Sequence, residues 1–110
     1  MAIDYYSQCG QDKFLISRVF KRKKKGYFVD VGAHDGLFIS NTATLEKDFN
    51  WSGVCVEPSS ASSRIPRARE ASAVVVACVG PEEFNNQIIK FRELNPTEIS
   101  KTMFRPDGEN

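Results

Sequence analysis

The chain has little net charge, few cysteines and no long hydrophobic run. Its 15 Lys and Arg residues nearly balance its 14 Asp and Glu residues, so no overall electrostatic field favours nucleic acid or an anionic membrane surface. No apolar run is long enough to span a bilayer, and the N-terminus lacks the hydrophobic region of a secretory signal peptide. We therefore expect no nucleic-acid partner, no membrane partner and a cytoplasmic location.

The three cysteines are odd in number and lack C-x-x-C spacing. Neither a disulfide framework nor a zinc site is supported by that pattern, and we expect no metal. Cys55 and Cys78 lie inside apolar runs, where a thiol usually behaves as a small buried hydrophobic group. This usage suits a reducing compartment.

At 110 residues the chain has the length of a single domain, residues 1–110, with a modest core. The apolar spacing of residues 11–25 predicts a first helix. The basic run 21–25, followed by Gly26, is typical of a helix end, where cations complement the dipole and glycine adopts the left-handed cap. An anion-binding patch is the alternative interpretation of this run.

Nearly continuous apolar runs at 27–32, 54–57 and 73–79 are typical of parallel strands that are covered on both faces. Residues 87–94 alternate enough to predict a fourth strand. Between the first two strands, a helix over 40–49 is expected with Ser40 or Asn41 as its cap.

The segment after Pro58 predicts a short, weak helix that is interrupted by Pro66. The polar residues 95–110 predict a poorly ordered tail. The alternation of strands and helices indicates an α/β fold. We expect a Rossmann-like, doubly wound parallel sheet, truncated to about four strands in the order 3-2-1-4.

Two acids end neighbouring strands of this sheet. Asp30 and Glu57 lie at the carboxyl ends of the first two strands, which is where ligands bind in open α/β sheets. The loop between Gly32 and Gly36 has no lysine, so it is not a P-loop. His34 occupies the position of the second glycine of a dinucleotide loop, and flanking carboxylates would repel a pyrophosphate by on the order of 1 kcal/mol.

S-adenosylmethionine has the opposite electrostatics, because it carries an ammonium and a sulfonium and no phosphate. Asp30 or Asp35 can accept a charge-assisted hydrogen bond from the ammonium, and Gly32 lets the backbone approach the methionine portion. Glu57 follows Gly36 by 21 residues, which suits a strand-end acid that binds ribose hydroxyls. The two acids therefore predict a cationic, ribose-bearing cofactor.

Three spaced segments, YSQCGQDKFL, GYFVDVGAHDGLFISNT and LEKDFNWSGVCVEPS, resemble in order the motifs of the FkbM family of S-adenosylmethionine-dependent methyltransferases. The resemblance covers about residues 6–58 and implies methyl transfer to a hydroxyl of a sugar, polyketide or related metabolite. It also implies a set of cofactor-binding residues: Gln8, Gln11, Asp12, Asp30, Gly32, Ala33, Asp35, Gly36, Ser40, Asn41, Glu57 and Pro58.

Several alternatives remain beside this one. His34 is a candidate general base for the hydroxyl acceptor, or a loop histidine without a catalytic role. Members of the family continue through further strands, so we expect residues 1–110 to be the cofactor-binding part and incomplete at the C-terminus. The chain could instead be a non-catalytic binding module or a nicotinamide-dependent oxidoreductase fragment. The strand at 87–94 would leave an exposed edge, through which we expect self-association.

Overall fold

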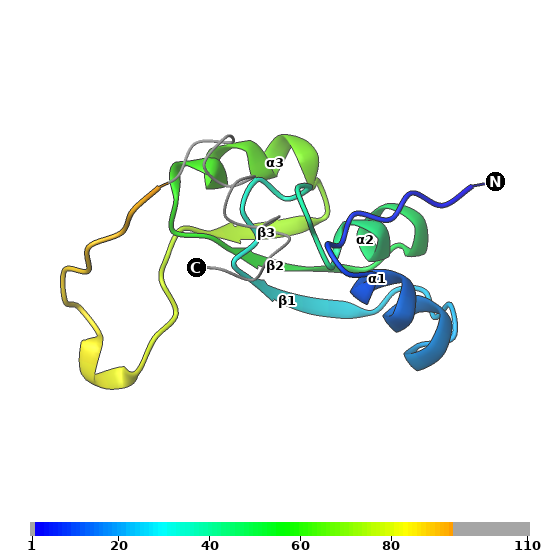
Figure 1. Ribbon diagram of the computed structural model, residues 1–110, viewed down its shortest axis with the longest axis horizontal. Helices are drawn as coiled ribbons and strands as arrows, with labels where there is room; N and C mark the ends of the chain where they lie inside the picture. The colour runs from blue at the N-terminus through cyan, green and yellow to red at the C-terminus, as the bar shows by residue number, and fades with distance from the viewer. Residues whose placement is uncertain (1, 94–110) are drawn as a thin grey trace, which may run out of the picture.

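A computed structural model describes residues 2–93 of the chain (Figure 1). Its centre is a three-stranded sheet of β1 (Tyr27–Val31), β2 (Ser52–Val56) and β3 (Ser72–Val75), in the order β1-β2-β3. Both pairs of strands are parallel, with Asp30 beside Cys55 and Cys55 beside Val74. The α/β class with a parallel sheet is confirmed, and β2 lies between β1 and β3 as predicted.

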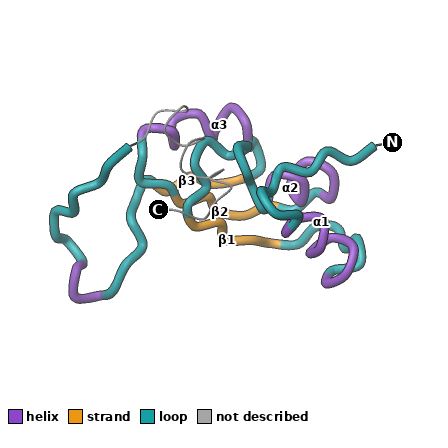
Figure 2. Tube along the Cα trace, in the orientation of Figure 1, coloured by secondary structure: helices purple, strands orange, loops and turns teal. Residues whose placement is uncertain are grey.

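The helices are short and lie between or before the strands (Figure 2). Before β1, α1 (Gln11–Phe14) continues into a π-helical turn, η1 (Leu15–Val19). Between β1 and β2 lies α2 (Ala43–Phe49), which begins three residues later than the predicted helix. Between β2 and β3 lie the 3₁₀ helix η2 (Ser60–Arg64) and α3 (Ile65–Ala68). A last 3₁₀ turn, η3 (Glu82–Phe84), follows β3.

Two predictions about helix ends, at Pro66 and at Gly26, are wrong. Pro66 lies in the first turn of α3 and does not interrupt it, because a proline is tolerated where the helix N–H groups have no intrahelical partner. The first helical segment ends at Val19, and Lys21 rather than Gly26 has a positive φ, of 47°. The predicted glycine cap is therefore wrong. Gly26 instead makes room for Trp51, since a Cβ there would lie 2.5 Å from the indole.

The hydrophobic core lies between the helices and one face of the sheet. Phe28 and Cys55 point from β1 and β2 into this core, and they meet apolar residues from the helical segments: Ile16, Leu45, Phe49 and Ile65. Trp51 belongs to the same core, and its indole N–H donates to the carbonyl of Lys23 at 2.8 Å. Trp51 is therefore a packing residue of the core.

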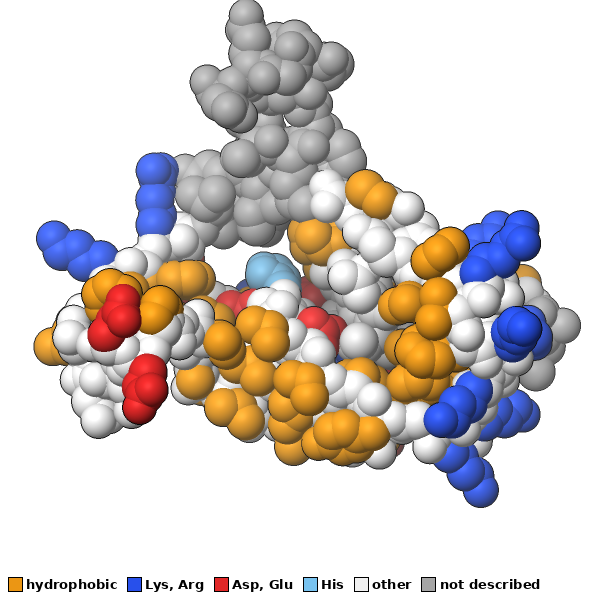
Figure 3. Space-filling view, turned by 90° about the horizontal axis from the view of Figure 1, so that it is seen from below, with side chains coloured by type: hydrophobic (Ala, Val, Ile, Leu, Met, Phe, Trp, Pro, Cys, Tyr) orange, Lys and Arg blue, Asp and Glu red, His pale blue; other side chains and the backbone are white. Residues whose placement is uncertain are grey.

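Within residues 2–93 the opposite face of the sheet is exposed along β1, although Val56 of the central strand is buried there. Tyr27, Val29 and Val31 alternate with the buried Phe28, and Val29 is 63% exposed. Figure 3 shows hydrophobic side chains gathered on the surface of the molecule that faces the viewer. The prediction that the strands are covered on both faces is therefore wrong for β1 and β3 among the described residues, whereas in β2 only Ser52 is exposed.

The third strand is shorter than predicted. β3 ends at Val75, whose carbonyl accepts from the amide of Glu57 at 3.0 Å. After Glu57 the segment that follows β2 continues with Pro58, which has no N–H to donate. It then turns into η2. Residues 76–79 therefore have no neighbouring strand. Cys78 lies in this stretch and is exposed, so its predicted burial is wrong, whereas Cys55 is buried as predicted.

The predicted fourth strand is absent from the described residues. Residues 76–93 leave the sheet as a long irregular arm (Figure 1), and no strand forms over 87–93. Ile88 is fully exposed, so no partner strand or helix is there to favour an extended pairing. The order 3-2-1-4 is thus wrong in its last member. Leu94 and the tail 95–110 lie outside the described residues. Within residues 2–93, no helix is long and apolar enough to cross a membrane.

Candidate functional site

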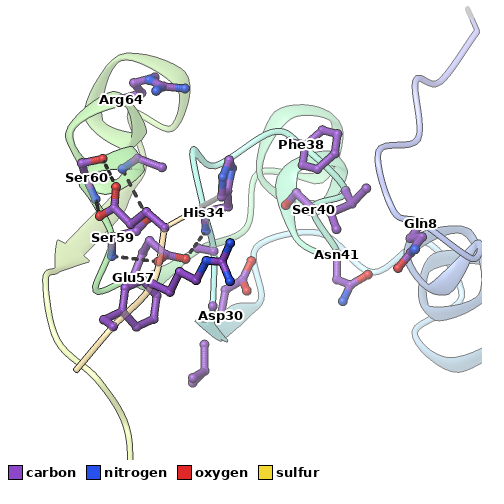
Figure 4. A pocket seen from close by; sticks show the side chains of 18 of the residues that line it. Gln8, Asp30, His34, Phe38, Ser40, Asn41, Glu57, Ser59, Ser60 and Arg64 are labelled. Carbon is purple, nitrogen blue, oxygen red and sulfur yellow. Dashed lines mark hydrogen bonds between the residues drawn. The ribbon is translucent and has the colours of Figure 1, made fainter. Parts of the chain in front are cut away.

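A pocket of about 530 Å³ opens at the carboxyl ends of β1 and β2 (Figure 4). Its volume lies in the range of small-molecule sites. Figure 3 shows a hollow with acidic side chains beside the histidine. Nine residues singled out from the sequence line the pocket: Gln8, Gln11, Asp30, Gly32, Ala33, His34, Ser40, Asn41 and Glu57. The structure therefore brings most of the predicted site residues to one place.

Glu57 closes the floor of the pocket at the end of β2. Its side chain is 6% exposed. Oε1 accepts a hydrogen bond from the backbone amide of His34 at 2.7 Å, and Oε2 accepts one from the amide of Ser59 at 3.0 Å (Figure 4). Each carboxylate oxygen has two lone pairs, so one acceptor position on each oxygen remains for a ligand.

Asp30 lies in β1, one residue before its end. Its Oδ2 accepts the hydroxyl proton of Thr42 at 2.6 Å. No described residue donates to Oδ1, and the residue lines the pocket. Because β1 and β2 are parallel neighbours, Asp30 and Glu57 lie at the same edge of the sheet. The pocket thus contains two carboxylates with free acceptor capacity.

The two glycines of the loop, Gly32 and Gly36, differ in how much space surrounds them. Gly32 has a φ of 82°, and a Cβ on it would meet no atom within 4 Å. A side chain at Gly32 would therefore contact no other described part of the chain. Gly36 has a φ of 88°, and a Cβ on it would lie 2.9 Å from Cγ of Arg69. Gly36 is buried and is not among the residues that line the pocket.

Asp35 organises the loop from inside. Its Oδ1 accepts from the amides of Leu37 at 3.0 Å and Phe38 at 2.8 Å, an arrangement typical of an Asx turn. Burial acts to raise the pKa of the Asp35 carboxyl, but these amides and the neighbouring His34 outweigh it, so the pKa is lowered. Asp35 does not line the pocket.

His34 has a φ of 54°, in the left-handed region that side chains rarely adopt. Its Nδ1 lies 3.7 Å from Oδ1 of Asp35 and has no hydrogen-bond partner among the described residues. Its ring tilts against that of Phe38, with centroids 5.7 Å apart. The imidazole borders the pocket, with one nitrogen beside a carboxylate.

The predicted cap of α2, Ser40 or Asn41, is wrong, because the N-cap residue is Thr42. Ser40 nevertheless bonds the start of this helix with its side chain. Its hydroxyl accepts from the amides of Thr42 at 3.2 Å and Ala43 at 3.0 Å, which satisfies N–H groups at the helix start. Asn41 makes no such contact among the described hydrogen bonds but lines the pocket. One wall is thus built from the segment that precedes α2.

The N-terminal motif separates into two roles. Gln8 and Gln11 line the pocket. Asp12 is fully buried, and its carboxylate accepts from the amides of Tyr6 at 2.8 Å and Lys13 at 2.8 Å. Asp12 therefore folds the N-terminal segment and does not line the pocket. Pro58 likewise lies outside the lining.

The sequence did not indicate one buried, extensively bonded side chain near the site. Arg69 follows α3 and is fully buried. It forms an ion pair with Glu46, at 3.0 Å between Nε and Oε1, and it contacts the loop between β1 and α2. In the sequence it is one of several cations in a segment with no motif, so nothing distinguishes it from its exposed neighbours.

The last described residues of the arm after β3 lie beside the pocket. Glu93 accepts hydrogen bonds from the backbone amide and the hydroxyl of Ser60, at 2.7 and 2.6 Å. These bonds lower the pKa of the exposed Glu93 carboxyl. Phe91 and Arg92 line the pocket beside it, as does Arg64 from η2.

Comparison of the chain with models of protein families, with curated proteins and with solved structures finds no match. Among the described residues, no group of three or more His, Cys, Asp or Glu side chains could hold a metal ion.

Proposed function

We propose that this pocket binds S-adenosylmethionine and that the chain is the cofactor-binding part of an FkbM-type methyltransferase with a Rossmann-like, doubly wound sheet. One observation carries the proposal: Asp30 and Glu57 line a single pocket at the carboxyl ends of adjacent parallel strands. The acceptor would be a hydroxyl of a sugar, polyketide or related metabolite, as the sequence resemblance implies.

The two carboxylates fit different parts of the cofactor. Glu57 is fixed by two backbone amides, and its remaining lone pairs suit two adjacent ribose hydroxyls. Asp30 keeps Oδ1 for an ammonium group, an interaction that is stronger than a neutral hydrogen bond. Gly32 borders the pocket without a side chain, so a ligand can approach the backbone closely.

A dinucleotide fits the pocket less well. In a dinucleotide fold, the glycine loop opens directly into a helix whose N-terminus faces the pyrophosphate. Here α2 begins at Ala43, well beyond Gly36. Asp30 and Glu57 would also place two negative charges beside the phosphates. These features favour a cationic ligand.

The cofactor supplies an activated methyl group on its sulfonium. The residues of this chain would hold the cofactor and align the acceptor oxygen with that methyl group, and such positioning supplies much of the rate of a group transfer. His34 is the candidate general base. The carboxylate of Asp35 at 3.7 Å from Nδ1 favours a proton on that nitrogen, which leaves Nε2 to accept the acceptor's hydroxyl proton.

The test is isothermal titration calorimetry with S-adenosylhomocysteine and, separately, with NADH. Asp30→Asn is the cleanest variant, because the Asn carbonyl oxygen can still accept from Thr42 while the free carboxylate oxygen becomes an NH₂ group. We expect the wild type to bind S-adenosylhomocysteine, Asp30→Asn to bind it about tenfold or more weakly, and neither to bind NADH.

Asp48→Asn is the matched control, since Asp48 is exposed on α2 and does not line the pocket. It should bind like the wild type. Binding of NADH in place of S-adenosylhomocysteine would favour the nicotinamide alternative. Binding of S-adenosylhomocysteine without turnover on any hydroxyl acceptor would favour a non-catalytic module.

A further inference from the structure

We infer that Arg69 and Thr42 are positioning residues that hold Asp30 in the orientation required by its ligand. The inference rests on the proposed function, because it assigns how a residue of the cofactor pocket is oriented. Neither Arg69 nor Thr42 lines the pocket. Both act from behind it, through a directed chain of hydrogen bonds from α3 to β1.

Arg69 reaches the loop between β1 and α2 with both of its terminal nitrogens. Nη1 donates to the carbonyl of Gly36 at 3.0 Å and to the hydroxyl of Ser40 at 3.3 Å. Nη2 donates to Oγ1 of Thr42 at 2.9 Å. Glu46 of α2 balances the charge through Nε at 3.0 Å. A planar guanidinium can serve all of these acceptors at once because its N–H groups diverge.

The chemistry of the donors fixes the direction of this chain. A guanidinium has no acceptor, so the hydroxyl of Thr42 must accept from Arg69. That hydroxyl has a single proton, and Oδ2 of Asp30 is its acceptor at 2.6 Å. The order is therefore Arg69 to Thr42 to Asp30. With Oδ2 held in this way, the other carboxylate oxygen of Asp30 is left for the pocket.

The loop that Arg69 holds needs support from outside itself. Residues 32–42 contain no regular helix or strand. They include His34 with a φ of 54° and Ile39 with a φ of 47°, and such conformations are costly for residues with a side chain. Arg69 lies in another part of the fold and bonds this loop at three points. Its contacts therefore order the wall that carries His34, Ser40 and Asn41.

Thr42 offers a sharper test than Arg69 itself. Removal of Arg69 would leave Glu46 buried without its cation, and the variant is expected to unfold. Thr42→Val keeps the shape of the side chain and removes the hydroxyl, whereas Thr42→Ser keeps the hydroxyl. We expect Thr42→Val to bind S-adenosylhomocysteine about tenfold more weakly and Thr42→Ser to restore most of the loss.

A double-mutant cycle separates positioning from general destabilisation. If Thr42 acts through Asp30, then Thr42→Val added to Asp30→Ala should weaken binding no further than Asp30→Ala does alone. Equal losses in both backgrounds would overturn the inference, because they would show that Thr42 acts independently of Asp30.

A measurement without ligand keeps the inference testable if the cofactor assignment fails. The carboxyl carbon of Asp30 can be observed by NMR in the free protein at neutral pH. Its resonance should shift in Thr42→Val and return towards the wild-type position in Thr42→Ser. An unchanged resonance in Thr42→Val would overturn the relay, whatever the ligand. A shifted resonance in a protein that does not bind S-adenosylhomocysteine would support the relay and reject the proposed function.

Discussion

The carboxylate of Glu57 is bonded to the backbone amide of His34 across 23 positions in the chain, at 2.7 Å from Oε1. This contact ties the end of β2 to the loop after β1. The second oxygen holds the amide of Ser59, so the same side chain also fixes the turn into η2. Glu57 is therefore both the floor of the candidate site and a clamp between two strand ends.

Substitution of Glu57 should consequently lower stability as well as binding. Glu57→Ala leaves two amide donors without their partner, and a charged hydrogen bond contributes roughly 1.5–3 kcal/mol. We expect a loss of about 2–4 kcal/mol in the free energy of unfolding, measured by urea denaturation. Glu82→Ala, at an exposed glutamate of η3, is the control and should change stability little. Equal stability of the two variants would contradict the clamp.

The two loop glycines should differ in their response to alanine. Both have positive φ values, so each substitution carries a backbone cost of about 1–2 kcal/mol. At Gly36 the new Cβ would also press on Cγ of Arg69 at 2.9 Å, which adds roughly 1–3 kcal/mol of overpacking. Gly36→Ala should therefore melt well below Gly32→Ala in a thermal denaturation scan. The reverse order would show that the Arg69 side chain moves aside at no cost.

The stability of the fold should depend on pH through Asp12. Burial acts to raise the pKa of the Asp12 carboxyl, but hydrogen bonds from Ser7, Tyr6 and Lys13 outweigh it, and the pKa is lowered. A lowered folded pKa means that this stabilisation is complete above about pH 5 and is lost as the pH falls below about 3.9. Asp12→Asn should thus be less stable than the wild type at pH 7.

The difference between these two proteins should shrink as the pH approaches 3. Urea denaturation at several pH values measures it, with Asp48→Asn as the control for an exposed carboxylate. A gap between wild type and Asp12→Asn that stays constant from pH 7 to pH 3 would exclude Asp12 as the titrating group.

The three thiols should differ in reactivity. Cys9 and Cys78 are exposed, and Cys55 is buried. Burial raises the pKa of the Cys55 thiol, with the nearby cation of Arg69 acting in the opposite direction. Because the thiolate is the reactive form, a thiol-reactive dye should label Cys9 and Cys78 rapidly in the native protein. Cys55 should be labelled only in denaturant. Mass spectrometry of tryptic peptides identifies the sites, and rapid native labelling of Cys55 would contradict its position in the core.

Self-association remains a prediction, but the structure changes where we expect it. The strand over 87–94 that was to provide the edge is absent from the described residues, and β1 is an outer strand of the sheet. Tyr27, Val29 and Val31 are exposed along it, and an apolar outer strand favours pairing with another chain. We expect association at micromolar concentration by light scattering. Val29→Lys should reduce it, whereas Lys47→Gln at an exposed position of α2 should not. Equal behaviour of the two variants would exclude this edge.

Local signals in the sequence determined the class of the fold and much of the candidate site. The apolar runs predicted the positions of β1 and β2 to within about two residues. This was possible because a run of apolar residues is visible in the local sequence. Asp30 and Glu57 follow from the same signal, since parallel strands place their carboxyl ends at one edge. A helix start near Ser40 was also predictable, because its hydroxyl accepts from amides only two and three positions further on.

Contacts between distant parts of the chain decided the rest. The end of β3 and the loss of the fourth strand depend on whether a partner strand is present, which no local pattern encodes. Asp12 and Asp35 resemble ligands by type and position, yet both oxygens of Asp12 and Oδ1 of Asp35 accept from nearby amides. Arg69 gains its place only because the fold brings α3 against a loop about 30 residues earlier. A cation is costly to bury alone, and only the tertiary structure supplies the carboxylate, carbonyl and hydroxyl oxygens that make its burial stable.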